Sequence, residues 1–83
     1  MIDWAWYTAE NTTFGDRLAA AREGAGLSAS DLARRAGVGL QTVRAWENDQ
    51  SEPRANTLQR VAGILGVSLM WLLAGEGEAG QDP

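Results

Sequence analysis

Residues 29–50 read ASDLARRAGVGLQTVRAWENDQ, and this stretch decides the fold. It holds two short helical patterns, each apolar on one side only, separated by the turn GVG at 37–39. Ala33 is small, as close crossing of two helices requires, and the first glycine of the turn tolerates a positive φ. Val43 and Trp46 point from the second pattern back towards the first. The stretch therefore predicts two crossing helices joined by a tight turn.

The helical pattern continues on both sides of this segment. Thr13, Ser28 and Ser68 are expected N-caps, because a hydroxyl oxygen can accept from the free amides of a first helical turn. Asp16 and Asp31 complete capping boxes with the first two. The sequence thus predicts an all-α fold with helices at 14–23, 29–36, 40–48, 55–65 and 69–73.

The two ends of the chain differ from this helical centre. Residues 1–13 form an N-terminal arm that carries Trp4, Trp6 and Tyr7 without a helical period. The arm either rests on the domain or docks on a partner subunit. Residues 14–75 make up the domain, and the glycine- and acid-rich tail 76–83 is expected to be disordered.

Composition removes several classes of function. The chain has neither cysteine nor histidine, which excludes thiolate chemistry and removes the commonest general base and metal ligand. We expect no enzyme, no cofactor and no metal site. There is no apolar run near ~20 residues and no signal-peptide pattern, so a cytoplasmic protein is expected.

The charge is unevenly distributed along the chain. The net charge is −4, yet the stretch from residue 14 to residue 73 contains seven arginines and six acidic residues. The centre is therefore slightly basic, although weakly so for a nucleic-acid-binding protein. Every cation is an arginine, whose planar guanidinium suits phosphates and base edges.

Short motifs along most of the chain resemble one known family, the phage-repressor/Cro type of helix-turn-helix protein, often called the XRE family. The resemblance covers about residues 14–75. Its motifs are FGDRL at 14–18, GLS at 26–28, LA at 32–33, GV at 37–38, TV at 42–43, AWEN at 45–48, PR at 53–54, LGVS at 65–68 and WLLAG at 71–75. The fold that it implies is a five-helix lambda-repressor-like domain.

The resemblance implies a small bacterial transcriptional regulator whose helix 40–48 lies in the major groove of double-stranded DNA. The helical wheel independently puts Gln41, Arg44, Ala45 and Asn48 on the side opposite the apolar residues. Gln41 is suited to adenine and Arg44 to guanine. The alternative is an ordinary solvated helix face.

Further DNA contacts are implied at the borders of this helix pair. Ser28 and Ala29 open the first helix, where free amides favour a phosphate. Thr42 and Asn48 are expected phosphate contacts, and Arg54 is expected at the backbone or the minor groove. A separate structural role is implied for Arg22 and Glu47, as an ion pair that ties helix 14–23 to helix 40–48.

Some residues depart from the family pattern. Many relatives have glutamine in place of Ala29 and a polar residue in place of Leu40, which here could contact only a thymine methyl group. Asp49 and Glu52 make the following loop acidic. These departures keep open a second interpretation, a protein-binding module of the antitoxin or adaptor type on the same fold.

A homodimer is implied by the resemblance, and two surfaces could form it. Met70 is expected to be exposed, because its neighbours Leu69, Leu72 and Leu73 are expected to fill the core. The other candidate is the aromatic arm with Trp4 and Trp6.

Overall fold

The computed structural model describes residues 6–79, which fold into five helices without a β-strand in this range. The helices are α1 (Phe14–Gly24), α2 (Ala29–Ala36), α3 (Leu40–Glu47), α4 (Ala55–Leu65) and α5 (Leu69–Ala74). The all-α prediction is confirmed, and the helix ends differ from the predicted ones by at most one residue. None of the described helices has the length and apolar character needed to span a membrane.

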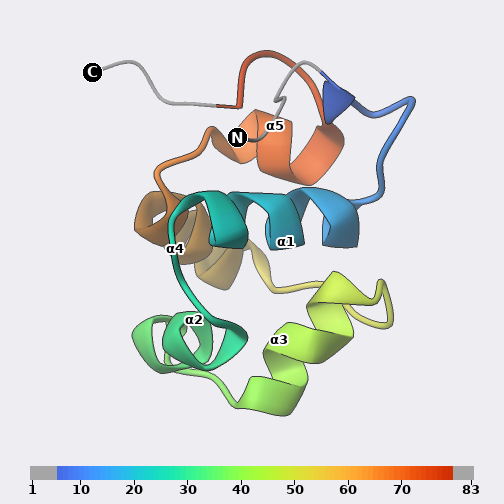
Figure 1. The fold of residues 1–83 in the computed structure, drawn as a ribbon. Helices are drawn as coiled ribbons and strands as arrows, with labels where there is room; N and C mark the ends of the chain where they lie inside the picture. The colour runs from blue at the N-terminus through green and yellow to red at the C-terminus, as the bar shows by residue number, and fades with distance from the viewer. Residues whose placement is uncertain (1–5, 80–83) are drawn as a thin grey trace.

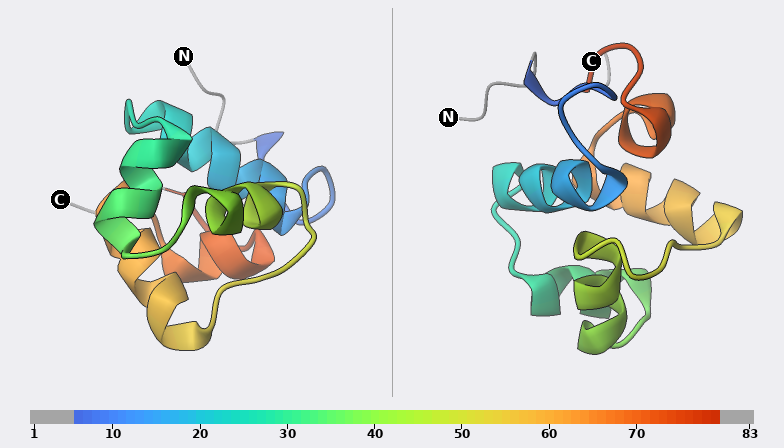
Figure 2. Two further views of the ribbon diagram at one scale, coloured as in Figure 1. Left: turned by 90° about the horizontal axis from the view of Figure 1, so that it is seen from below. Right: turned by 90° about the vertical axis from the view of Figure 1, so that its right-hand side faces the viewer.

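The helices lie in three levels. α1 and α4 form the middle level, α2 and α3 lie together at one end, and α5 covers the other end (Figures 1 and 2). The core between these levels contains side chains with no exposed surface from all five helices: Leu18, Leu32, Val43, Val61 and Leu72. One continuous apolar core therefore holds α2 and α3 against the rest of the molecule.

The predicted caps start three of the helices. The hydroxyls of Thr13 and Ser28 accept from the amides of Asp16 and Asp31, whose carboxylates accept in return from the cap amides. Ser68 accepts from the amide of Trp71 in the same way. Caps of this kind each stabilise a helix by about 1 kcal/mol, so the helix starts are encoded locally.

The described part of the arm, residues 6–13, lies on the domain next to α1 and α5 (Figure 1). The Trp71 indole donates to the carbonyl of Tyr7 over 2.7 Å, and Thr12 is buried. Trp6 is 52% exposed. Trp4 lies outside the described residues.

Buried Arg17 joins the arm to α5, a contact that the sequence patterns did not predict. Its guanidinium donates to the carbonyls of Leu72, Leu73 and Thr12 over 3.1, 3.1 and 2.9 Å. Burial lowers the pKa of Arg17, whereas the charges of Asp16 and Asp49 act in the opposite direction.

Two expectations for the C-terminal part are wrong. Leu73 was expected in the core but is 47% exposed, because Trp71 and Leu72 occupy the inner side of the six-residue helix α5. Residues 76–79 were assigned to a disordered tail, but Ala79 is buried and its carbonyl accepts from the amide of Ser68 over 2.7 Å. Residues 80–83, the rest of the predicted tail, lie outside the described residues.

Candidate functional site

The turn between α2 and α3 brings the two helices into close contact. Gly37 ends α2 with φ +76°, in the left-handed region that other residues enter at a cost of roughly 1 kcal/mol. The amide of Val38 donates to the carbonyl of Ala33 over 3.0 Å, which closes the turn. Ala33 and Ala36 are buried, so no bulky side chain keeps α2 away from its neighbours.

α3 presents a polar side to solvent. Val43 and Trp46 are buried and fix its rotation about the helix axis. Gln41, Arg44 and Asn48 are exposed on the opposite side, since they follow one another at helical spacing. α3 and its C-cap residue Asn48 thus hold three polar side chains outward from a rigid base.

The structure places all the predicted contact residues at the surface or at its border. Ser28, Gln41, Thr42, Arg44, Asn48 and Arg54 are exposed, whereas Ala29, Leu40 and Ala45 are half-buried. The half-buried Ala29 packs against the core, so only its backbone amide can face a ligand. Arg54 follows the loop after α3 and is the N-cap of α4.

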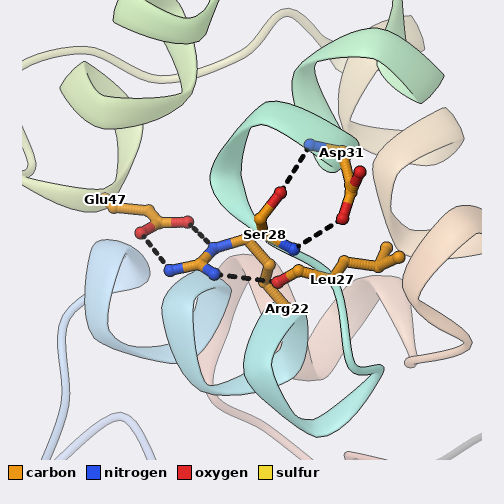
Figure 3. A network of polar contacts seen from close by, with 5 residues as sticks. All are labelled: Arg22, Leu27, Ser28, Asp31 and Glu47. Atoms are coloured by element: carbon orange, nitrogen blue, oxygen red, sulfur yellow. Dashed lines mark hydrogen bonds and ion pairs between the residues drawn. The ribbon is translucent and has the colours of Figure 1, made fainter.

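Arg22 and Glu47 form the expected ion pair between α1 and α3 (Figure 3). Nε and Nη2 of Arg22 donate to the two carboxylate oxygens over 2.6 and 3.1 Å, and Nη1 donates to the carbonyl of Leu27 over 2.9 Å. Both side chains are mostly buried, at 16% and 15% exposure. The hydrogen bond with Glu47 raises the pKa of Arg22, so the guanidinium stays charged. It fixes the C-terminal half of α3 relative to α1.

A second anchor at the end of α3 was missed by the sequence analysis. Asp49, at φ 59°, accepts from the amide of Gly15 over 2.9 Å and from the hydroxyl of Thr13 over 2.6 Å. A β-carbon at position 15 would collide with the carbonyl oxygen of Glu47. Asp49 is therefore a structural acid that binds the N-terminus of α1, where the helix dipole favours it. The expectation that it is simply an unfavourable charge in the loop is corrected.

The start of α2 is already occupied by its own capping box. The carboxylate of Asp31 accepts from the amide of Ser28 over 3.0 Å and from Arg34 over 2.9 Å (Figure 3 shows the contacts with Ser28). Hydrogen bonds from Ser28 and Arg34 lower the pKa of Asp31 to about 2. A phosphate at this helix start would meet a carboxylate as well as free amides.

The acids of this half of the molecule are largely neutralised, while several arginines are not. Asp31, Glu47 and Asp49 are engaged as described above, and among the acids of residues 25–60 this leaves Glu52. The exposed side chains of Arg35, Arg44 and Arg54 make no hydrogen bond or ion pair with any residue in the range 6–79. The surface around α2 and α3 is therefore more cationic than the net charge of −4 indicates.

Comparison with known proteins gives the same architecture. A family model described as Helix-turn-helix (HTH_3) matches residues 18–72. A protein of Haemophilus influenzae described as an uncharacterized HTH-type transcriptional regulator is 36% identical over 47 residues, which is 57% of this chain. The chain spans only a part of that relative, since the match covers 20% of its length.

Solved structures with this fold include repressors bound to DNA. The P22 c2 repressor in complex with a synthetic operator has a TM-score of 0.74 and 26% identity, over 78% of this chain and 98% of that one. SinR of Bacillus subtilis, a master regulator for biofilm formation, in complex with DNA has a TM-score of 0.67 and 31% identity, over 72% and 97%. A complex of SinR with the protein SinI has a TM-score of 0.67 and 34% identity, over 74% and 60%.

Proposed function

The chain belongs to the helix-turn-helix family of the phage-repressor type, and from this premise we propose that it binds double-stranded DNA sequence-specifically as a small bacterial transcriptional regulator in the cytoplasm. The observation that carries the proposal is the outward polar side of α3. Gln41, Arg44 and Asn48 stand there on a helix whose other side is locked by the core and by two anchors to α1. The proteins with which it shares this fold are regulators rather than enzymes.

In the proposed complex α3 lies in the major groove. Gln41 pairs with adenine and Arg44 with guanine through bidentate hydrogen bonds, each worth about 1–3 kcal/mol of discrimination. Leu40 and Ala45 border this side and contact thymine methyl groups.

The remaining candidates position the protein on the DNA backbone. Thr42 and Asn48 contact phosphates beside α3, and Arg54 reaches the backbone or the minor groove. At the start of α2, the Ala29 amide and the exposed Ser28 side chain contact a phosphate, since the Ser28 amide is held by Asp31. Because Asp31 lies at the same helix start, we assign this last contact a smaller contribution than the arginines make.

Two copies are proposed to bind two half-sites, because one α3 helix reads only a few base pairs. The dimer surface that the structure favours is the outer side of α5, where Met70 and Leu73 are 52% and 47% exposed one helical turn apart. The aromatic arm with Trp6 is the second candidate for this surface.

The decisive experiment compares the wild type with Arg44→Lys and Arg44→Ala on a DNA fragment from its own upstream region and on random DNA, at about 50 and 200 mM salt. The wild type should prefer the upstream fragment. Arg44→Lys should lose that preference and keep the salt dependence, because lysine keeps the charge but not the planar fork. Gln41→Ala and the exposed Gln59→Ala on α4 form a matched pair in which only the first should weaken specific binding.

Absence of binding to either DNA at low salt would contradict the proposal. The antitoxin or adaptor interpretation predicts that Arg44→Ala leaves the biological activity intact.

A further inference from the structure

A groove lies on the outer side of α1, between this helix and the arm. Its volume is about 270 Å³, and it is open along one side. The residues that line it are Trp6, Tyr7, Asp16, Ala19, Ala20 and Glu23. It is separate from the proposed DNA-binding surface, since none of these residues belongs to α2 or α3.

The geometry of α1 explains the position of the groove. Gly15 and Arg22 face α3, and Arg17 faces α5. At 100° per residue, the lining residues at 16, 19, 20 and 23 fall on the remaining outer side. The arm covers one edge of this side, because Trp71 holds the backbone of Tyr7. The two alanines form a floor that larger side chains would fill.

The lining is aromatic and acidic without a basic residue. Asp16 and Glu23 are exposed, and the Glu23 carboxylate makes no hydrogen bond with a described residue. The nearby guanidinium of Arg22 donates its hydrogen bonds to Glu47 and to the Leu27 carbonyl, so Glu23 interacts with it only through space. Half-exposed Trp6 and Tyr7, in an edge-to-face pair with ring centroids 5.3 Å apart, add aromatic surface. Aromatic faces and carboxylates together attract guanidinium and ammonium groups.

The rest of this end of the molecule has the same sign of charge. Glu10, Glu76 and Glu78 are exposed on the arm and after α5, at the end opposite α2 and α3 (Figure 1). A polyanion is therefore disfavoured here, and a basic ligand is attracted over a longer distance. The open shape suits a segment of a protein surface better than a small molecule, which is usually enclosed by its pocket.

We propose that this groove binds a basic segment of a partner protein, with two cationic side chains that meet Asp16 and Glu23 and stack on the arm aromatics. The two acidic residues are seven positions apart on α1, which corresponds to about 10 Å along the helix. Basic residues three positions apart in a polyproline-II segment have about the same separation, ~9 Å, and lie on one side of it. The partner can bind while α3 is on DNA, because no residue of the groove belongs to α2 or α3.

The test uses the full chain and a ten-residue peptide with two arginines separated by two alanines, in a neutral glycine–serine background. In two-dimensional NMR, the peptide should shift the Trp6 indole signal and the amides of residues 16–23. Trp6→Ala and Glu23→Gln should each weaken binding by about threefold to tenfold. Glu76→Gln removes the same charge outside the groove and should change the affinity less than twofold.

Three results would overturn the proposal. One is equal weakening by Glu76→Gln and Glu23→Gln, which would mean attraction to net charge alone. Another is binding of spermidine or free arginine as tight as that of the peptide, which would indicate a small organic cation. The third is absence of shifts in the groove. DNA binding by Glu23→Gln, measured in parallel, should equal that of the wild type, because Glu23 belongs to neither the proposed DNA-binding surface nor the proposed dimer surface. The outcome of this test is therefore distinguishable from the outcome for the proposed function.

Discussion

At the scale of single residues, Gly15 decides how closely α1 approaches the end of α3. A β-carbon at this position would collide with the carbonyl oxygen of Glu47 and with the Asp49 carboxylate. Gly63, in α4, has the same helical environment but open space around its α-carbon. The two glycines therefore form a matched pair in which one substitution tests packing and the other tests helix propensity.

We expect Gly15→Ala to lower the free energy of unfolding by about 1–3 kcal/mol, because backbone atoms must move apart. Gly63→Ala should raise it by up to about 1 kcal/mol, since alanine loses less conformational entropy in a helix. Urea denaturation measures both. Equal effects of the two substitutions would show that α1 and the end of α3 are not held by close contact.

The Arg22–Glu47 pair supports a second prediction at this scale. Removing one partner leaves a poorly solvated charge, so Glu47→Gln should cost about 3 kcal/mol of unfolding free energy. Arg34→Ala breaks the Arg34–Asp31 pair, in which the arginine is 70% exposed, and should cost less than about 1 kcal/mol. A double-mutant cycle on each pair measures the coupling. If the coupling energy of the Arg22–Glu47 pair is as small as that of the Arg34–Asp31 pair, the structural role of Glu47 is contradicted.

At the scale of elements, the helices follow from signals close to them in sequence. The capping residues Thr13, Ser28 and Ser68 lie within three positions of their partners, so the starts of these three helices could be predicted locally. The contacts of Asp49 with Gly15 and of Arg17 with Leu72 join residues 34 and 55 positions apart. Such contacts depend on how the helices are placed, and neither periodicity nor capping indicates them.

The polar side of α3 could be predicted for the same local reason. Val43 and Trp46 determine which side is buried, and the exposed side follows from the helical period. On α5 this reasoning was insufficient, because residues 69–73 are all apolar and leave no polar side for comparison. Only the packing shows that Leu73 is outside.

The start of α2 gives a prediction with a defined pH range. The folded-state pKa of Asp31 is lowered to about 2 from 3.8, so its contribution to stability is present above pH 3.8 and is lost as the pH falls towards 2. Asp31→Asn should therefore weaken the dependence of the melting temperature on pH between pH 4 and pH 2. At neutral pH, the backbone amides of α2 should exchange their hydrogens faster in this variant than in the wild type. An unchanged pH profile would mean that the capping carboxylate does not stabilise the folded state.

At the scale of the whole molecule, the charges are separated between two ends. Unpaired arginines lie on or next to α2 and α3, together with Glu52 and the engaged Asp49, whereas the other exposed acids lie on the arm, the outer side of α1 and the segment after α5. The net charge of −4 averages over these ends and hides the cationic one. Such a distribution orients the molecule as it approaches DNA, with the acidic end directed away.

The dimer prediction also belongs to this scale. Met70 and Leu73 lie next to each other on the outer side of α5, and they are large apolar side chains with about half of their surface exposed. If this surface joins two copies, Met70→Glu and Leu73→Glu should each shift the sedimentation coefficient to that of a monomer, because two like charges would meet across a symmetric contact. Circular dichroism should remain that of the wild type, since neither side chain is in the core.

DNA binding by the monomeric variants tests whether the dimer is the form that binds DNA. In a dimer, binding of one α3 helix to its half-site brings the second α3 helix close to the other half-site. Monomeric variants should therefore bind the upstream fragment at least about 100-fold more weakly than the wild type. Their binding to a single half-site should be unchanged. Trp6→Ala is the control, because it removes the other large apolar side chain exposed in the described residues and leaves α5 intact. If Trp6→Ala gives the monomer and Met70→Glu does not, the arm forms the dimer, and the groove beside it belongs to that contact instead of to a basic partner.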